Sequence, residues 1–224
     1  MFRYIRKIEF QTICDYIDEG SSVLDLGCGD CELLHMLIKD KNIKAQGIEI
    51  DEKGIYKCVE KGVSVLHEDI EYGLSDYNDK SFDYIVLQQS LSEVVKQPDK
   101  VIQESLRVGR KVIISFSNFA HYSSRVQIFL KGRTPITPSL PYSWYDTPNL
   151  HFLSLSDFIK YCRERKINIE KILSVSNYRA GFLKKIFGNR VLLLFESIYQ
   201  SLFSFITITY RIRPRCLLKD CGVA

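Results

Sequence analysis

The sequence has no stretch with the low hydrophobicity and high charge of a disordered region, no internal repeat and no low-complexity linker. Hydrophobic residues make up 46% of its 224 residues and charged residues 26%, which is usual for a folded soluble protein. This length is long for one typical domain and short for two. We therefore expect one domain over residues 1–224 that carries additional elements.

Features of exported and membrane proteins are also missing. The first 17 residues form an amphipathic, charged helical pattern, without the continuous apolar stretch and small-residue cleavage site of a signal peptide. Residues 191–210 are aromatic-rich, but Glu196, Gln200 and several hydroxyl residues interrupt them, so we expect neither a membrane span nor membrane association. We expect a cytoplasmic protein.

Two further kinds of partner are disfavoured. The net charge is only +4, from 31 basic and 27 acidic residues, and the excess lies in short clusters, so we expect no nucleic-acid partner. The seven cysteines are odd in number and scattered along the chain. We expect reduced thiols and no metal site.

Short apolar runs that predict buried strands alternate with stretches of helical periodicity. After an N-terminal helix, strands are expected at 22–27, 44–50, 63–70, 81–90 and 111–118. Residues 119–150 contain four prolines and are expected to form an irregular cover segment. A helix, a sixth strand, a helical insert at 182–202 and a last strand follow. The alternation predicts an α/β fold with a doubly wound, mostly parallel, seven-stranded sheet.

The first strand ends in the turn DLGCGD, residues 25–30, just before a helix. In an open α/β sheet such a turn is where ligands bind. Gly27 and Gly29 allow a close backbone approach, and the N–H groups of the helix can hold an anion. A dinucleotide fingerprint would need glycine at Glu32, and a Walker loop would need Gly-Lys-Ser/Thr. An amino-acid head group fits better, with its ammonium near Asp25.

The next strands supply groups for a nucleoside. Glu49 ends the second strand, where a carboxylate can accept both hydroxyls of a ribose. Asp69 follows the third strand and can accept from an adenine amino group, with Ile70 packed on the ring. A nucleoside joined to an amino acid indicates S-adenosylmethionine, or S-adenosylhomocysteine. The predicted cofactor-binding residues are Asp25, Gly27, Cys28, Gly29, Glu49, Ile50, Asp69, Ile70 and Gln88, the last on the methionine side.

Each of these positions also has an ordinary structural explanation. A glycine-rich turn is often only a tight connection, and an acidic residue after a strand often caps a helix. The order of glycine turn, Glu49 and Asp69 on successive strands is what favours the cofactor.

These motifs resemble a known family. VLDLGCGD, GIEID and ED resemble the class I S-adenosylmethionine-dependent methyltransferases, and SFDYIVLQQSLSEVV and LPYSWYDTPNLH are similar to the MetW family of methionine biosynthesis proteins. The resemblance covers residues 21–174. It implies a Rossmann-like methyltransferase fold and work beside a homoserine O-acyltransferase, acetyl or succinyl. The sequence departs from the family at Cys31, where glycine is usual, and at the 182–202 insert.

The cover segment holds aromatic and polar side chains of the kind that line pockets or interfaces. Candidate substrate or partner contacts are Tyr142, Trp144, Tyr145, Asp146 and Asn149, and candidate catalytic bases are His121 and His151. The alternative is that Trp144 and Tyr145 fill a core beneath the loop. No serine or cysteine nucleophile is framed by a recognisable elbow or triad.

Two functions stay open at this point. One is an S-adenosylmethionine-binding partner of the acyltransferase in methionine biosynthesis. The other is an active methyltransferase that acts on an unidentified small molecule. Methyl transfer from a sulfonium needs an aligned acceptor and at most modest help from a base, so the lack of a catalytic motif excludes neither.

Overall fold

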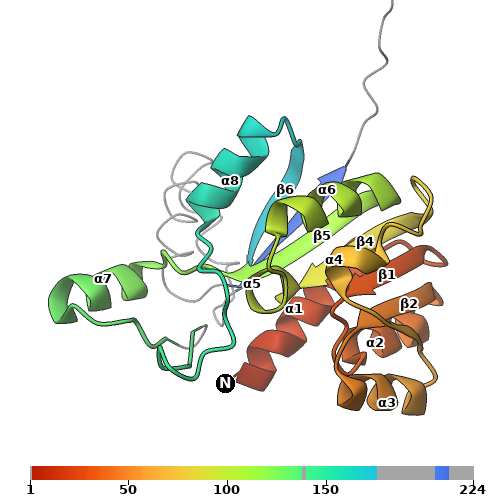
Figure 1. The fold of residues 1–224 in the computed structure, drawn as a ribbon, viewed down its shortest axis with the longest axis horizontal. Helices are drawn as coiled ribbons and strands as arrows, with labels where there is room; N and C mark the ends of the chain where they lie inside the picture. The colour runs from red at the N-terminus through yellow and green to blue at the C-terminus, as the bar shows by residue number, and fades with distance from the viewer. Residues whose placement is uncertain (1, 138–139, 176–204, 212–224) are drawn as a thin grey trace, which may run out of the picture.

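A seven-stranded sheet is the centre of the computed structural model, which describes residues 2–137, 140–175 and 205–211. The strand order is β3-β2-β1-β4-β5-β7-β6 (Figure 1). The strands are β1 (Ser22–Leu26), β2 (Lys44–Glu49), β3 (Ser64–His67), β4 (Phe82–Gln88), β5 (Gly109–Ser117), β6 (Ile169–Val175) and β7 (Phe205–Arg211). Every strand expected from the sequence is present, with ends that differ by a few residues.

The direction of the strands confirms the mostly parallel sheet. All neighbours from β3 to β5 are parallel, and β7 runs antiparallel to both β5 and β6. β2 and β3 lie on one side of β1, and β4 and β5 lie on the other, so the strand order reverses at β1. Ligands of such sheets bind outside the carboxyl ends of the strands at this reversal. The turns after β1, β2 and β4 therefore meet where the sequence predicts the cofactor.

Helices cover both faces of the sheet (Figure 1). They are α1 (Phe2–Tyr16), α2 (Glu32–Lys41), α3 (Glu52–Glu60), α4 (Ile70–Gly73), α5 (Ser90–Glu93), α6 (Pro98–Val108), α7 (Tyr122–Lys131) and α8 (Leu155–Glu164). Apolar residues of α1, α2 and α3 pack on one face, and those of α4, α5, α6 and α8 pack on the other. Within the part of the chain that the structure describes, no helix has the length and apolar character to cross a membrane.

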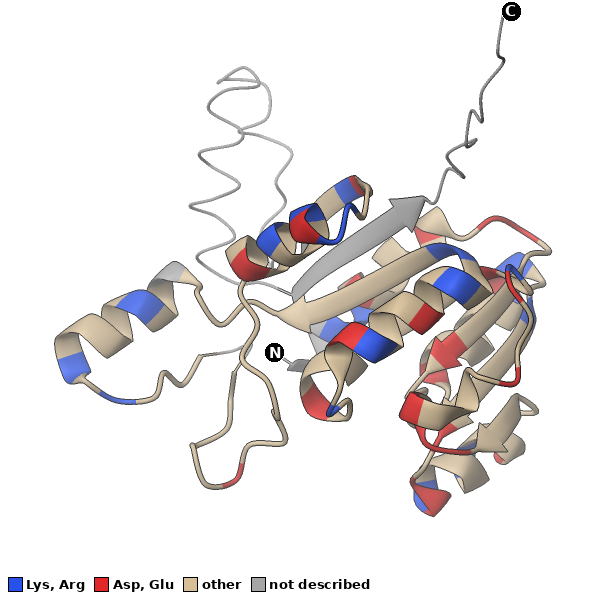
Figure 2. Cartoon of the chain, turned by 45° about the horizontal axis from the view of Figure 1, so that its top comes forward, with Lys and Arg blue, Asp and Glu red and all other residues tan. Residues whose placement is uncertain are grey.

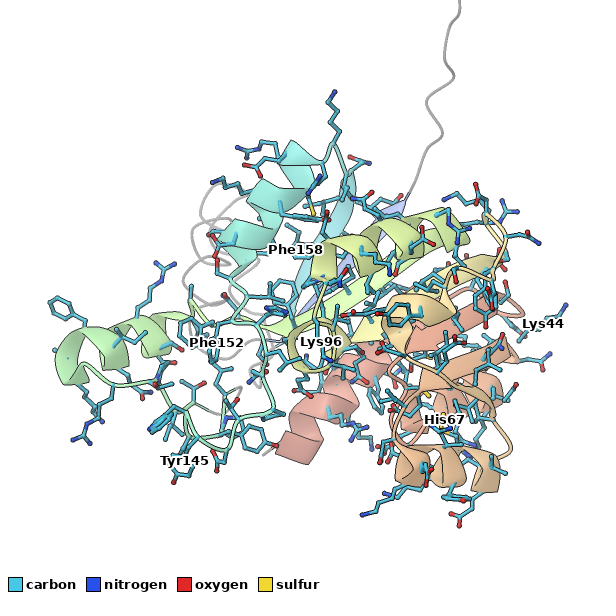
Figure 3. The ribbon with its side chains drawn as sticks, in the orientation of Figure 1. Lys44, His67, Lys96, Tyr145, Phe152 and Phe158 are labelled. Atoms are coloured by element: carbon cyan, nitrogen blue, oxygen red, sulfur yellow. A yellow bond between two sulfur atoms is a disulfide. The ribbon has the colours of Figure 1, made fainter. Side chains whose placement is uncertain are left out.

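The central strands are buried on both faces, because successive side chains point to opposite sides. Val23 packs in the cluster beneath α1 and α2, and the next residue, Leu24, packs in the cluster beneath α6 and α8. On that second face, Phe158 of α8 lies against Phe116 of β5, with ring centroids 5.2 Å apart (Figure 3). Such strands appear in a sequence as almost continuous apolar runs, which made them recognisable.

The cover segment differs from the irregular structure expected over 119–150, because it begins with the regular helix α7. His121 caps this helix by accepting the N–H of Ser123, and Gly132 ends it in the left-handed conformation. All four prolines come after residue 132, so none of them interrupts the helix. α7 projects away from the sheet and carries basic but no acidic residues (Figure 2). The helical insert expected at 182–202 lies outside the described residues.

Candidate functional site

The turn between β1 and α2 is shaped for the close approach of a ligand. Gly27 and Gly29 have φ angles of 74° and 57°, which favour glycine. The N–H of Gly27 donates to the carbonyl of Ile48 at 2.9 Å and so fixes the turn on the end of β2. A Cβ atom at Gly27 would lie 2.9 Å from Oγ of Ser90, so this position excludes a side chain.

Asp25 of β1 is buried beside this turn, with 1% of its surface exposed. Its Oδ1 atom has no hydrogen-bond partner. Burial, to which the charge of Glu49 adds, raises the pKa of Asp25 to about 7. A buried carboxylate without a partner is costly, and a neighbouring cation would relieve that cost. The position is therefore suited to an ammonium group.

Glu49, at the end of β2, already binds the backbone of two turns. Its Oε2 accepts the N–H of Gly29 at 2.7 Å. Its Oε1 accepts the N–H groups of Ile50 and Asp51 at 2.8 and 2.9 Å. An ionised carboxylate has about four acceptor positions, and these bonds use three of them. The carboxylate of Glu49 can therefore accept one ribose hydroxyl without any change. To accept both hydroxyls, it must share or release one of its bonds to the backbone.

The groups predicted to hold an adenine are partly used by the fold. Asp69 caps α4, because its Oδ1 accepts the N–H of Glu71 at 2.9 Å. Ile70 is only 3% exposed and lies behind Gly27 in the core, whereas Ile50 is 52% exposed. Ile50 and the second carboxylate oxygen of Asp69 are therefore better placed for an adenine than Ile70 is.

A carboxylate from the N-terminal helix, which no motif of the sequence predicts, joins this edge of the sheet. Glu9 of α1 is 1% exposed, and Nε2 of Gln89 donates to its Oε1 at 3.4 Å. Burial raises the pKa of Glu9, although the neighbouring polar side chains of Ser115, Gln89 and Gln88 oppose this shift. Gln88, predicted to line the cofactor, thus lies near Glu9. The apolar periodicity of α1 gave no signal for this contact, because it depends on where the helix crosses the sheet.

The cysteines correct one expectation. Cys31 and Cys58 form a disulfide, so the expectation of reduced thiols is wrong for this pair. The side chain of Cys28, a predicted cofactor-binding residue, lies beneath the turn, where a Cβ atom at Gly47 would meet its Sγ at 2.5 Å. The sequence held one signal, since Cys28 and Cys31 have CxxC spacing. Cys58 joins them only through the packing of α3.

The two candidate bases have different environments. His121 is 1% exposed, and its Nδ1 accepts the N–H of Ser123 at 3.1 Å as the cap of α7. His151 donates its backbone N–H to the carbonyl of Ser92 in α5 at 3.1 Å, and its Nε2 is buried without a hydrogen bond. His151 is therefore the better candidate for an imidazole that accepts a proton.

The aromatic residues of the cover segment face solvent. Trp144 and Tyr145 are 75% and 73% exposed, so the alternative that they fill a core is wrong. Their rings pack edge to face, with centroids 5.7 Å apart. Tyr145 lies at the outer end of the loop (Figure 3). Tyr142 and Asn149 line a small pocket with Trp144, and Asp146 is exposed. Exposed aromatic groups of this kind mark interaction surfaces.

Two solved structures share the fold. A SAM-dependent methyltransferase from Archaeoglobus fulgidus has a TM-score of 0.64, with 18% identity over 94% of each chain. An S-adenosylmethionine dependent methyltransferase from Mesorhizobium loti has a TM-score of 0.62, with 16% identity over 92% of this chain and 98% of that one. The expected Rossmann-like class I methyltransferase fold is confirmed.

Sequence comparison gives the family. The model of the family described as methionine biosynthesis protein MetW matches residues 7–195. A bifunctional methionine biosynthesis protein MetXA/MetW from Rhodopirellula baltica is 34% identical over 160 residues, which are 67% of this chain and 25% of that protein. The chain thus spans about a quarter of the length of this relative. With the fold and the family motifs in agreement, the chain belongs to the MetW family of methionine biosynthesis proteins.

Proposed function

We propose that this protein binds S-adenosylmethionine or S-adenosylhomocysteine at the carboxyl edge of its sheet and acts beside a homoserine O-acyltransferase. The observation that carries the binding proposal is the buried carboxylate of Asp25, whose Oδ1 has no partner, between the glycine turn and Glu49. The methyltransferase fold of the structural neighbours supports the same ligand.

The residues of the turn suit the parts of this ligand. Asp25 would accept from the ammonium, Gly27 and Gly29 would allow the ligand to approach the backbone closely, and Glu49 would accept from the ribose. Ile50 and Asp69 would contact the adenine. S-adenosylmethionine, when bound, supplies a methyl group on a positively charged sulfur, and the buried acidic groups Asp25 and Glu9 lower the cost of a cation here.

The proposed partner rests on a fused relative and on an exposed surface. The relative from Rhodopirellula baltica unites MetXA and MetW parts in one bifunctional protein. We infer that this chain works with a separate homoserine O-acyltransferase, acetyl or succinyl, in the cytoplasm. Trp144, Tyr145 and Asp146 are exposed and would contact that partner, since aromatic residues are enriched at the centres of interfaces.

Calorimetric titration with S-adenosylhomocysteine tests the binding proposal. The wild-type protein should bind, and Glu49→Gln should weaken binding by about 1 to 3 kcal/mol, because an amide places a donor where the carboxylate accepts. Glu60→Gln, an exposed carboxylate at the end of α3, is the matched control and should bind normally. Absence of binding by the folded wild-type protein would reject the proposal.

Mixing experiments test the partner. The purified protein and the homoserine O-acyltransferase of the same organism should elute together from a size-exclusion column, and the complex should differ from the acyltransferase alone in acyl transfer. Separate elution with unchanged acyl transfer, at concentrations of about 10 μM, would contradict the partnership, since specific interfaces of ordinary size bind more tightly than this.

A methyltransferase acting on a small molecule is the second candidate. The buried Nε2 of His151, which has no hydrogen bond, favours it, because such an imidazole can accept a proton from an acceptor group. Incubation with methyl-labelled S-adenosylmethionine and a fractionated metabolite extract tests this function. Label in a small molecule with the wild type, and at least roughly 100-fold less with His151→Gln, would support it. Absence of labelled product would contradict it.

A further inference from the structure

Three cysteine sulfur atoms converge beneath the glycine turn. The Sγ atoms of Cys28, Cys31 and Cys58 all lie within 4.8 Å of one another, and all three side chains are buried. Cys31 and Cys58 are bonded, and Sγ of Cys28 lies 3.3 Å from that of Cys31 and 3.9 Å from that of Cys58. A thiol this close to a disulfide can exchange with it, because exchange proceeds by attack of one sulfur on another.

The disulfide joins the two halves of the proposed binding site. Cys31 follows the glycine turn directly and starts α2, and Cys58 lies on α3, just beyond Glu49. Sγ of Cys58 is 3.3 Å from the carbonyl oxygen of Gly29. A Cβ atom at Gly54 of α3 would come within 2.6 Å of the same oxygen. α3 therefore rests directly on the turn, and the disulfide fixes this contact.

Cysteine at position 31 is not explained by the backbone. Its φ and ψ angles are 54° and 26°, in the left-handed region that glycine adopts without cost. Its side chain makes no capping hydrogen bond to α2. What cysteine adds there is its sulfur, bonded to Cys58 and next to Cys28.

We propose that Cys28, Cys31 and Cys58 form a thiol–disulfide exchange site, and that the Cys31–Cys58 bond raises the affinity of the turn for the S-adenosyl ligand. The second part rests on the proposed function. The bond holds Gly29 and Glu49 in place before the ligand arrives, so less conformational freedom is lost on binding.

A low-molecular-weight disulfide, such as glutathione disulfide, is the oxidant that forms the Cys31–Cys58 bond from two thiols. The Cys28 thiolate attacks it and releases one glutathione, and Cys31 then displaces the second glutathione from Cys28. Cys58 attacks Cys31, which leaves the Cys31–Cys58 bond and a free Cys28 thiol. In sum, two protein thiols lose two electrons and two protons, and one glutathione disulfide becomes two glutathione molecules. An excess of dithiol reverses the sequence.

The surroundings make this exchange slow. Cys28 is 8% exposed, against 0% for Cys31 and Cys58, so external reagents reach it first. Burial, with the charges of Asp25 and Glu49, raises the pKa of Cys28, and only the thiolate attacks. The bond is thereby protected from rapid reduction.

Redox titration of the full chain tests the inference. The protein is equilibrated at glutathione ratios from fully reduced to fully oxidised, quenched with acid, alkylated and mapped by peptide mass spectrometry. We expect the Cys31–Cys58 pair in the oxidised form, melting roughly 5 to 10 °C above the reduced form. The oxidised form should bind S-adenosylhomocysteine at least about fivefold more tightly in calorimetry.

Three variants test the roles of the individual cysteines. Cys28→Ser should keep the pair but reach redox equilibrium at least about tenfold more slowly, because the accessible attacking sulfur is gone. Cys31→Gly suits the left-handed backbone, removes the pair and should abolish the redox dependence of ligand affinity. Cys14→Ser, a buried cysteine of α1, is the control and should behave as the wild type.

The possible outcomes separate the two parts of the proposal. Cysteines 31 and 58 that never pair, or three thiols held by a co-purifying metal ion, would overturn the exchange site. Equal affinity of the oxidised and reduced forms would overturn the coupling to the ligand. If neither form binds S-adenosylhomocysteine, the proposed function fails, while the mapping and the melting temperatures still decide the exchange site.

Discussion

Replacing Asp25 with asparagine should stabilise the ligand-free protein and weaken ligand binding. In the folded protein the pKa of Asp25 rises from 3.8 to about 7, and each pKa unit corresponds to about 1.4 kcal/mol. Ionisation of this carboxyl therefore costs the folded state about 4 kcal/mol at neutral pH. Asparagine avoids that cost, but its buried amide without a partner loses about 1 to 3 kcal/mol. We expect a net gain of about 1 to 3 kcal/mol at neutral to mildly alkaline pH.

The sign of the pH dependence makes this prediction specific. The pKa of Asp25 is higher in the folded than in the unfolded protein, so the protonated carboxyl adds to the free energy of unfolding. This contribution is complete below about pH 4 and is lost as the pH rises to about 7. Between about pH 5 and 7 the free energy of unfolding of the wild type should fall, relative to Asp25→Asn, by about 1.4 kcal/mol per pH unit. Above about pH 8 the difference should be constant.

Urea unfolding of both proteins across this pH range, in one redox buffer, gives the comparison. Titration with S-adenosylhomocysteine on the same samples should show at least about tenfold weaker binding by Asp25→Asn, because the ammonium loses its charged acceptor. A stability difference that does not change with pH, or unchanged ligand affinity, would refute this account of Asp25.

Three other predictions follow from the described contacts. Gly27→Ala should cost about 2 kcal/mol more than Gly132→Ala in urea unfolding, because both have a positive φ but only Gly27 has an atom near its Cβ position; equal costs would contradict this. Trp144→Ala should change the melting temperature by no more than about 2 °C, since the ring is exposed, while reducing capture of the acyltransferase; a large loss of stability would show a core role. Glu9→Gln should raise stability at alkaline pH and lose this advantage as the pH falls, because burial raises the pKa of Glu9; an advantage that persists at low pH would argue against desolvation as the cause.

Most of the fold could be predicted from the sequence, because its signals are local. Strands buried on both faces appear as short apolar runs, and the turn at Gly27 and Gly29 needs the φ angles that only glycine adopts easily. The helix α7 was missed because the prolines of the cover segment dominated its composition, although all of them follow Gly132. A glycine that ends a helix, such as Gly132, is therefore better evidence for the helix than the mean composition of the segment is evidence against it.

The parts of the site that were not predicted depend on contacts between distant residues. The apolar pattern of α1 shows that the helix packs, but not that Glu9 reaches Gln89, the residue after β4. The three backbone bonds of Glu49 are likewise set by how two turns meet. The pairing of Cys31 with Cys58 spans 27 residues and depends on the packing of α3. By contrast, the CxxC spacing of Cys28 and Cys31 can be recognised in the sequence.

A crystal structure of the protein grown with S-adenosylhomocysteine would locate the proposed binding site. We expect the ligand at the carboxyl edge of β1 and β2, with its ammonium within hydrogen-bond distance of Oδ1 of Asp25 and its ribose on the carboxylate of Glu49. A ligand bound elsewhere, or an open edge without ligand at a saturating concentration, would contradict it.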